Sequence, residues 1–226
     1  MSDFHGVFPL IPKIEGEYDF ICVSGDNAPH FKQNWDYNDY FERMLNTKKE
    51  AEDQKKWIKN EMIPFLSKIS CKNSPIVING NHDFGDYTDL FENYTFQDPK
   101  NITLDGIKFG LLPGMVKTSG FWSDEITEDE FDRRIHELDS DTQILISHSP
   151  PKAVLDMDNG NRWGSDSIYK SIFGLSGMTP YFSSLRCHFF GHVHDSENSR
   201  IEHEIDDRKV IFINAACKVV KLEIDV

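Results

Sequence analysis

The 226-residue sequence predicts an α/β layered sandwich with mixed sheets, folded as a single domain over residues 1–226. Three observations indicate this class: short apolar runs typical of buried strands, charge-rich stretches with helical spacing between them, and strand pairs around tight turns. With 38% hydrophobic and 12% aromatic residues, the chain has the composition of a globular protein. Its length is sufficient for a substantial buried core.

Four apolar runs have the length and the β-branched or aromatic content of buried strands. They cover residues 20–23, 75–78, 144–146 and 187–190, and each ends in a cluster of Gly, Asn, Asp, Ser or His. Open α/β sheets place their sites outside the carboxyl ends of the strands. We therefore expect the polar clusters to meet in one shared site.

Two further segments carry helical signals. Residues 38–69 are charge-rich, and their apolar residues recur with a partly helical period, which predicts a long amphipathic helix or a helix pair, bent or restarted near Pro64. We interpret the charges of this segment as a solvated face. Thr127 and Glu130 form a capping-box pattern ahead of a second predicted helix over residues 131–138.

Two turns predict strand pairs. Asp105-Gly106 separates residues 102–104 from residues 107–112, and this dipeptide supplies the positive φ that a type I′ hairpin turn needs. A second pair, residues 202–205 with residues 209–214, is predicted around Asp206-Asp207. These pairs give the sheets antiparallel members and make them mixed.

The charge balance excludes several classes of protein. The chain has 24 Lys plus Arg against 38 Asp plus Glu, a formal charge of −14, which argues against non-specific binding to nucleic acid and to anionic membrane surfaces. No apolar run approaches the roughly 18 to 20 residues of a membrane span, and the first residues carry no leader pattern. We therefore expect a cytoplasmic protein. The sequence carries no signal of oligomeric state.

The four cysteines, Cys22, Cys71, Cys187 and Cys217, show no metal-site spacing. We expect them to be small buried apolar residues. His188 alternates with the apolar residues of its strand and is predicted to be structural.

Eight side chains near the chain start and the predicted strand ends are candidate ligands or catalytic groups. Taken singly, each is an ordinary turn or surface residue. Jointly, imidazole with carboxylate is a ligand set for Mn, Fe or Zn. On an extended backbone, the imidazoles two residues apart at 192 and 194 would point the same way, towards two adjacent metals. The eight residues are Asp3, His5, Asp26, Asn81, His82, His148, His192 and His194.

Five short motifs occur in chain order: Asp3-Phe4-His5-Gly6, Gly25-Asp26-Asn27, Gly80-Asn81-His82-Asp83, His148 after a strand, and Gly191-His192-Val193-His194. Together they resemble the ordered motifs of the calcineurin-like metallophosphoesterases. Residues 148–216 are further similar to the metallophosphoesterase-domain-containing proteins of the brain and fetal type. The family fold implied is a four-layer αββα sandwich of mixed sheets with a two-metal site at the strand ends.

The resemblance implies that the protein holds two divalent metal ions, Mn as the leading candidate and Fe, Zn, Ni or Mg as alternatives. It implies a first metal held by Asp3, His5 and His194, a second held by Asn81, His148 and His192, and Asp26 as the bridge. A bridging carboxylate partly neutralises two cations roughly 3.5 to 4 Å apart, and such a pair yields hydroxide near neutral pH. In this family that bridging hydroxide attacks phosphorus.

Further residues flank the implied metals. By the same resemblance, His82 gives a hydrogen bond or a proton to the phosphoryl or leaving oxygen, and Asp83 orients the His82 ring and raises its basicity. The alternative for Asp83 is a turn cap. Asn27, His30 and Trp163 are candidates for the substrate pocket, although a loop position for His30 and a core position for Trp163 stay open.

The first motif departs from the family pattern, because only Met1 and Ser2 precede Asp3, where the family has a buried strand. Three explanations stay open: a minimal strand, residues upstream in the natural protein, or a first metal that is held less rigidly.

The leading functional hypothesis is a two-metal hydrolase of a phosphodiester or phosphomonoester of a small substrate. Analogy to the brain and fetal-type proteins suggests a cyclic nucleotide. Residues 118–125 and 157–166 are the predicted specificity loops. The negative charge does not argue against a small phosphate ester, since two divalent ions add four positive charges beside the two negative ones of Asp3 and Asp26.

Three alternatives are weaker. A serine/threonine protein phosphatase carries an Arg shortly after the second motif, whereas Asn27-Ala28-Pro29-His30 follows Asp26 here. A repair nuclease brings basic surface and an extra domain, which the length and charge do not provide. A non-catalytic scaffold of this fold loses metal ligands, whereas all of them are present here.

Overall fold

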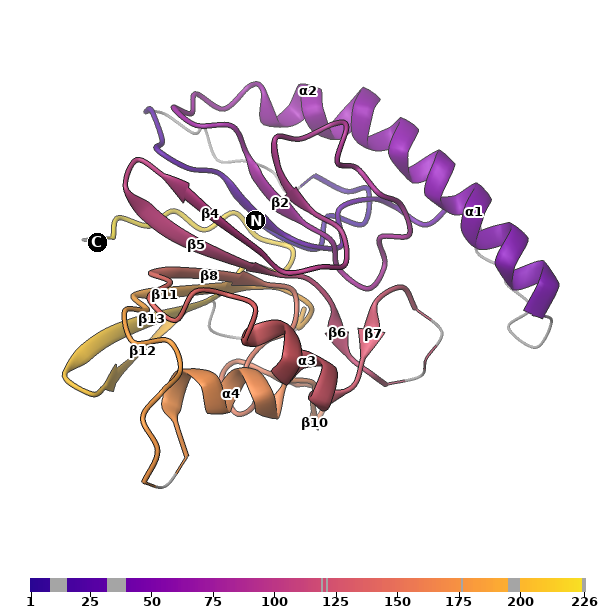
Figure 1. Ribbon diagram of the computed structural model, residues 1–226. Helices are drawn as coiled ribbons and strands as arrows, with labels where there is room; N and C mark the ends of the chain where they lie inside the picture. Colours follow the sequence, from indigo (N-terminus) through magenta and orange to yellow (C-terminus); the bar gives the residue numbers. More distant parts are fainter. Residues whose placement is uncertain are drawn as a thin grey trace.

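The computed structural model describes residues 1–8, 16–31, 40–118, 120, 122–175, 177–194 and 200–224, with the backbone alone at residues 40–46. Two sheets lie face to face, and helices cover the outer face of each (Figure 1). The helices α1 and α2 lie on one side of the molecule, and α3 and α4 lie on the other. The predicted αββα sandwich is confirmed.

The smaller sheet is wholly parallel, in the order β1-β2-β3. Its strands are β1 Cys22–Ser24, β2 Ile76–Ile78 and β3 Asn93–Thr95.

The larger sheet has the order β12-β13-β11-β8-β5-β4 and is mixed, because its four central strands are parallel and its two edge strands are antiparallel to their neighbours. The parallel strands of each sheet bring their carboxyl ends to one edge. The six strands are β4 Lys100–Leu104, β5 Ile107–Leu112, β8 Ile144–Ser147, β11 Cys187–Phe190, β12 Arg200–Ile205 and β13 Arg208–Asn214.

Two short strand pairs lie outside these sheets. They are β6 Met115–Val116 with β7 Glu125–Ile126, and β9 Met157–Asp158 with β10 Asn161–Arg162.

The first helical segment consists of three pieces, α1 Tyr40–Trp57, the π-helical turn η1 Ile58–Met62 and α2 Ile63–Leu66. Pro64 stands in the first turn of α2, where its missing N–H and fixed φ are tolerated. The predicted restart near Pro64 is therefore present, and a π-helical turn joins the two α-helices.

The helix α3 Glu128–Ile135 begins three residues before the predicted start at residue 131 and ends earlier than residue 138. Thr127 caps it, because the Thr127 hydroxyl oxygen accepts from the N–H of Glu130 at 3.3 Å. The Glu130 carboxylate pairs with Arg133 and Arg134 rather than reaching back to Thr127. The prediction placed the start at the first apolar residue, whereas the cap fixes it one turn earlier. The helix α4 Asp166–Phe173 is capped by Ser165.

Both predicted hairpins are present. Asp105 and Gly106 join β4 to β5 with φ of 51° and 83°, and Asp206 and Asp207 join β12 to β13 with φ of 46° and 62°. Positive φ at both central residues is what a type I′ turn requires.

Three buried apolar clusters hold the layers together. One lies beneath α1 and α2, one lies between the two sheets, and one lies beneath α3 and α4. All four cysteines are free; Cys187 is buried and Cys22 and Cys71 are partly buried. The expectation of a buried cysteine is wrong for Cys217, which is exposed in the segment after β13. Among the described residues we find no helix with the length and apolar content needed to cross a bilayer.

His188 packs under α3 and α4, within 5.0 Å of the Phe190 ring centroid, and its Nε2 lies 2.7 Å from the Ser147 hydroxyl. That hydroxyl donates to the carbonyl of Ser149. Burial lowers the pKa of His188 to about 3, because the apolar surroundings disfavour the imidazolium. The position agrees with the predicted structural role.

His188 predicts a specific acid sensitivity. Its pKa is lower in the folded chain than in the unfolded chain, so the unfolded state gains a proton first, and stability falls as the pH drops from about 6.5 towards 3. At pH 5 we expect this group alone to cost about 2 kcal/mol relative to pH 7. Urea unfolding at both pH values should show a smaller loss for His188→Phe than for wild type. Equal losses in the two proteins would contradict the assignment.

Candidate metal centre

Four strand ends meet at one edge of the sandwich. β1 leads into Gly25 and Asp26, β2 into residues 79–83, β8 into His148, and β11 into residues 191–194. These strands run parallel within their sheets. The polar residues that directly follow them therefore converge, as the sequence predicts.

The chain start joins this edge through a minimal strand. Ser2 forms a parallel bridge with Ala216, the N–H of Ser24 donates to the Met1 carbonyl at 3.0 Å, and the N–H of Asp3 donates to the Gly25 carbonyl at 3.0 Å. Asp3 is thereby buried beside Asp26. A minimal strand is therefore present at the chain start.

The candidate ligands form two groups, and within each group the ligand atoms of the carboxylate and the two imidazoles lie within 4.8 Å of one another. In the first group, Asp3 Oδ1 is 3.1 Å from His194 Nε2, and His5 completes the set. The second group is Asp26, His148 and His192.

Asn81 belongs with the second group, because its Oδ1 lies 3.0 Å from His148 Nε2. The residues brought together are thus the seven that the resemblance assigned to two metals, in the same division.

Asp26 lies between the two groups. Its Oδ2 is 3.6 Å from His5 Nε2 and 3.4 Å from His148 Nε2, and its Oδ1 accepts from the N–H of His82 at 2.8 Å. The carboxylate is 1% exposed. One buried carboxylate therefore reaches donors of both groups.

The backbone of the ligand turns is unusual. Asp3, His5, Asp26 and His192 all have positive φ, between 43° and 69°, a region that side-chain-bearing residues rarely adopt. The expected extended backbone is wrong at His192. Its N–H donates to Asp3 Oδ2 at 3.0 Å, which holds the turn. The turn sends His192 towards His148 and His194 towards His5, with ring centroids 5.2 and 5.3 Å apart.

Two motif glycines are required by close approach of these turns. A Cβ on Gly80 would lie 2.2 Å from Asp26 Oδ1, and a Cβ on Gly191 would lie 2.3 Å from Asp3 Oδ2. Any larger residue would displace a carboxylate, so the glycines set how closely the turns can pack.

The electrostatics of the centre favour cations. Burial opposes ionisation of Asp26, but the neighbouring His148, His82 and His5 hold the pKa of Asp26 well below its usual value. Burial also opposes the charge on His148, yet Asp26 and Asp3 raise the pKa of His148 to about 9. Two buried carboxylates, four imidazoles and one amide oxygen form a donor set that fits divalent ions such as Mn²⁺, Fe²⁺ or Zn²⁺.

Asp83 does not orient His82, so that prediction is wrong. Its carboxylate accepts from the N–H of Asn27 at 2.9 Å, from the Asn27 side-chain amide at 2.8 Å, and from the N–H of Gly80 at 2.9 Å. Burial, followed by repulsion from Asp26, raises the pKa of Asp83 to about 7. Asp83 is the turn cap of the alternative interpretation, and it ties the loop after β1 to the loop after β2.

His82 lies beside both groups but has other partners than predicted. Its Nδ1 is hydrogen-bonded to His30 Nε2. Its ring centroid is 4.2 Å from that of Trp122 and 5.1 Å from that of His5. Burial lowers the pKa of His82 to about 4. Trp122 was not a candidate, although it falls within the predicted specificity loop 118–125.

The three candidates for substrate contact have different outcomes. His30 is partly buried and lies at the site through its bond to His82. Trp163 is partly exposed, and its ring centroid lies 6.0 Å from that of His192. Asn27 is fully buried, and its amide donates to Asp83 and to the Ile78 carbonyl. The prediction for Asn27 is wrong, because its amide closes the loop rather than facing a pocket.

Two polar residues of α1 contact the loops of the site, although they are not among the predicted site residues. Glu50 accepts from the N–H of Phe31 at 2.7 Å, and Gln54 Nε2 donates to the His82 carbonyl at 2.8 Å. Both are buried, so the expectation of a solvated face is wrong here. The spacing of four that continues from Glu50 through Gln54 to the buried Ile58 could have revealed this inner face.

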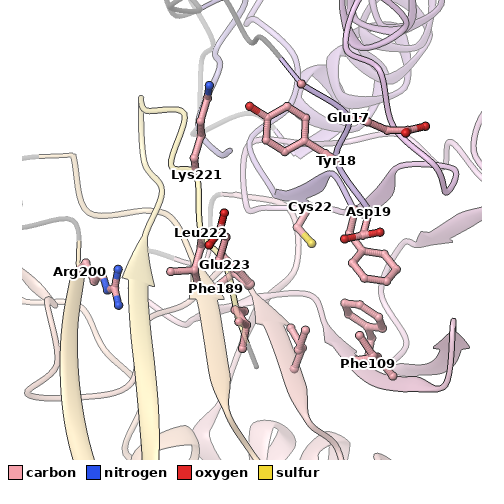
Figure 2. A pocket seen from close by; sticks show the side chains of 15 residues that line it. Glu17, Tyr18, Asp19, Cys22, Phe109, Phe189, Arg200, Lys221, Leu222 and Glu223 are labelled. Atoms are coloured by element: carbon pink, nitrogen blue, oxygen red, sulfur yellow. The ribbon is translucent and has the colours of Figure 1, made fainter. Parts of the chain in front are cut away.

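A cavity of about 900 Å³ lies away from the ligand groups, at the opposite ends of the strands. Cys22, Ile107 and Ile144, the first residues of β1, β5 and β8, line it. Figure 2 shows Tyr18 on one side and Leu222 of the C-terminal segment on the other. This cavity contains none of the candidate ligands.

Comparison with known proteins agrees with the geometry. A family model described as calcineurin-like phosphoesterase matches residues 1–196. The chain is also similar to a UPF0046 protein of Caenorhabditis elegans, with 25% identity over 162 residues that cover 62% of this chain and 51% of that protein. The chain spans about half the length of this curated relative.

The role of Asp83 can be tested by stability. Asp83→Ala leaves several buried N–H donors unpaired, and we expect it to lower the free energy of unfolding by about 3 kcal/mol or more. The matched control is Asp86→Ala, at an exposed residue of the same loop that accepts from Thr88, for which we expect a loss below about 1 kcal/mol. Equal urea midpoints for the two variants would show that Asp83 is no anchor.

Proposed function

The chain belongs to the calcineurin-like phosphoesterase family, and on that premise we propose that it is a two-metal-dependent hydrolase of small phosphate esters. The observation that carries the proposal is the position of Asp26, within 3.6 Å of His5 and 3.4 Å of His148. A carboxylate that reaches two ligand groups is the arrangement that a pair of adjacent cations needs.

In this proposal Asp3, His5 and His194 hold one ion, and Asp26 is shared with the other. The second ion has the ligands Asn81, His148 and His192. Mn²⁺ is the leading candidate, with Fe, Zn, Ni or Mg as alternatives, since such a donor set suits several divalent ions. When bound, the ions supply Lewis acidity towards phosphoryl oxygens and lower the pKa of water for attack on phosphorus.

His82 is the residue we assign to proton transfer. It flanks both groups, its backbone N–H donates to Asp26, and its Nδ1 is taken by His30. Nε2 is therefore the ring nitrogen left for a substrate oxygen. At Nε2 the ring can take up the proton that the attacking water releases and give it to the leaving oxygen as the P–O ester bond breaks, so one ester and one water yield one alcohol and one phosphate with one ester bond fewer.

Two indole rings support a substrate with a planar group. The Trp122 ring packs against the His82 ring, and the Trp163 ring lies near the His192 ring. Two histidines of the candidate centre therefore each have an indole ring beside them. Both indole side chains are partly exposed. Aromatic faces of this kind stack on flat rings, which favours a nucleotide, cyclic or open, over a simple alkyl phosphate.

The acidic chain is compatible with such a substrate. At a formal charge of −14, phosphate binding depends on the bound cations rather than on Lys and Arg. The absence of non-specific nucleic-acid binding, the absence of membrane binding, the cytoplasmic location and the single-domain organisation stay predictions.

The proposal is tested by assaying the Mn²⁺-loaded protein on bis-p-nitrophenyl phosphate and on 2′,3′- and 3′,5′-cyclic nucleotides. We expect turnover by wild type and none by Asp26→Ala. For His82→Ala we expect a loss of about 10²- to 10⁴-fold in kcat on the cyclic nucleotides, as for removal of an acid–base group, and a smaller loss on the p-nitrophenyl ester, whose leaving group needs no proton. Elemental analysis should show wild-type metal content in His82→Ala and less metal in Asp26→Ala.

Absence of turnover on every ester with each of Mn, Ni, Fe and Zn would overturn the proposal. Metal content at wild-type level in Asp26→Ala would overturn the bridging role separately. Asp86→Ala, outside the centre, serves as the control for both measurements.

A further inference from the structure

A second histidine contacts the His82 ring, and a buried glutamate lies next to that second histidine. His30 Nε2 bonds to His82 Nδ1, and His30 Nδ1 lies 3.5 Å from Glu50 Oε1. The three side chains come from the loop after β2, the loop after β1 and helix α1. They form a line that leads from the candidate metal centre to a carboxylate in the interior.

We propose that His30 and Glu50 are positioning residues that fix the orientation and the tautomer of His82. The proposal rests on the function proposed above only for its effect on rate. The arrangement itself is independent of which ester is hydrolysed.

The tautomer follows from the donors and acceptors along the line. A carboxylate can only accept, so the proton of His30 belongs on Nδ1, which faces Glu50. The neutral His30 ring then presents Nε2 as an acceptor, and the proton of His82 belongs on its Nδ1. His82 Nε2 is left with a free lone pair, the form that takes up a proton on the side away from His30.

The surroundings hold the line in place. Glu50 is 2% exposed, and the N–H of Phe31 donates to it at 2.7 Å. Gln54, one turn further along α1, donates to the His82 carbonyl at 2.8 Å. The Trp122 ring covers His82, with a 38° angle between the rings. Backbone and ring of His82 are therefore both constrained, and His30 is the partner that selects the rotation of the ring.

His30 and Glu50 take the place that Asp83 was expected to have beside the His82 ring. The Asp83 carboxylate accepts from the N–H groups of Asn27, Ala28 and Gly80 and from the Asn27 side-chain amide, so these loop donors occupy it and it does not orient His82. A ring with no acceptor at Nδ1 would populate both tautomers, and in one of them Nε2 carries the proton and cannot take up another. His30 and Glu50 supply the orienting role at longer range.

The consequence for rate depends on the leaving group. An ester with a poor leaving group, such as an alkoxide, needs a proton from His82, whereas p-nitrophenolate leaves without one. Loss of His30 should therefore lower kcat about 10- to 100-fold for an alkyl ester and less than about 3-fold for the p-nitrophenyl ester. KM and metal content should not change.

The test uses four variants of the full chain: His30→Leu, which removes the acceptor; His30→Gln, which restores one; Glu50→Gln, which removes the charge; and His136→Leu as the control. His136 is an exposed histidine at the end of α3. Each is loaded with Zn²⁺, which is diamagnetic, and ¹⁵N NMR of the imidazoles reports the His82 tautomer without any turnover.

We expect the Nδ1–H tautomer in wild type, His136→Leu and His30→Gln. A mixture is expected in His30→Leu, and His30→Gln should recover much of the rate on the alkyl ester. Glu50→Gln should weaken the preference, because His30 Nδ1 no longer faces a charge.

An unchanged His82 tautomer in His30→Leu, or equal losses of kcat on the two esters, would overturn the proposal. If wild type hydrolyses neither ester, the proposed function fails while the NMR result still decides the positioning role. If the His30 variants do not fold, the ¹⁵N spectrum of Glu50→Gln decides instead: a weaker preference for the Nδ1–H tautomer of His82 supports the proposal, and an unchanged preference overturns it.

Discussion

Two carboxylates buried side by side at one edge of the sandwich are the constraint on which the rest of the centre depends. Asp3 and Asp26 are 2% and 1% exposed, and buried negative charges of this kind need compensating positive charge. The imidazoles of His148 and His194, whose pKa values the two carboxylates raise, supply part of it, and Asp3 additionally holds the turn at His192. The positive φ values of the ligand turns and the motif glycines are consistent with this constraint. They let four loops come close to the carboxylate oxygens of Asp3 and Asp26.

Buried polar side chains, in addition to the strand ends, hold the loops at this edge of the sandwich in position. Asp83 ties the loop after β1 to the loop after β2, and Gln54 links α1 to His82 and, through its Oε1, to the N–H of Phe84 at 2.8 Å. Because such groups are costly to leave unpaired in the interior, they fix loop positions more firmly than apolar contacts. Glu50 extends the same scaffold to His30 and, through it, to His82.

Much of the fold and the grouping of the ligands could be predicted, because local patterns determine them. Turn chemistry at Asp105-Gly106 indicates a hairpin, and five motifs in order indicate the seven candidate ligands. The partners of His82 could not be predicted in this way. Whether Asp83 faces a ring or a loop amide depends on how two loops pack, and Glu50 is separated from His30 by 20 positions in the sequence. The helical spacing from Glu50 to Ile58 was present but was outweighed by the charge of the segment.

Anomalous diffraction from Mn²⁺-soaked crystals tests most directly whether Asp26 joins two metal sites. Data collected at the manganese edge should show two peaks roughly 3.5 to 4 Å apart, with the Asp26 carboxylate in contact with both. Asp3 should contact only the peak beside His5, and His148 only the other. A single peak, or two peaks of which only one touches Asp26, would contradict the account.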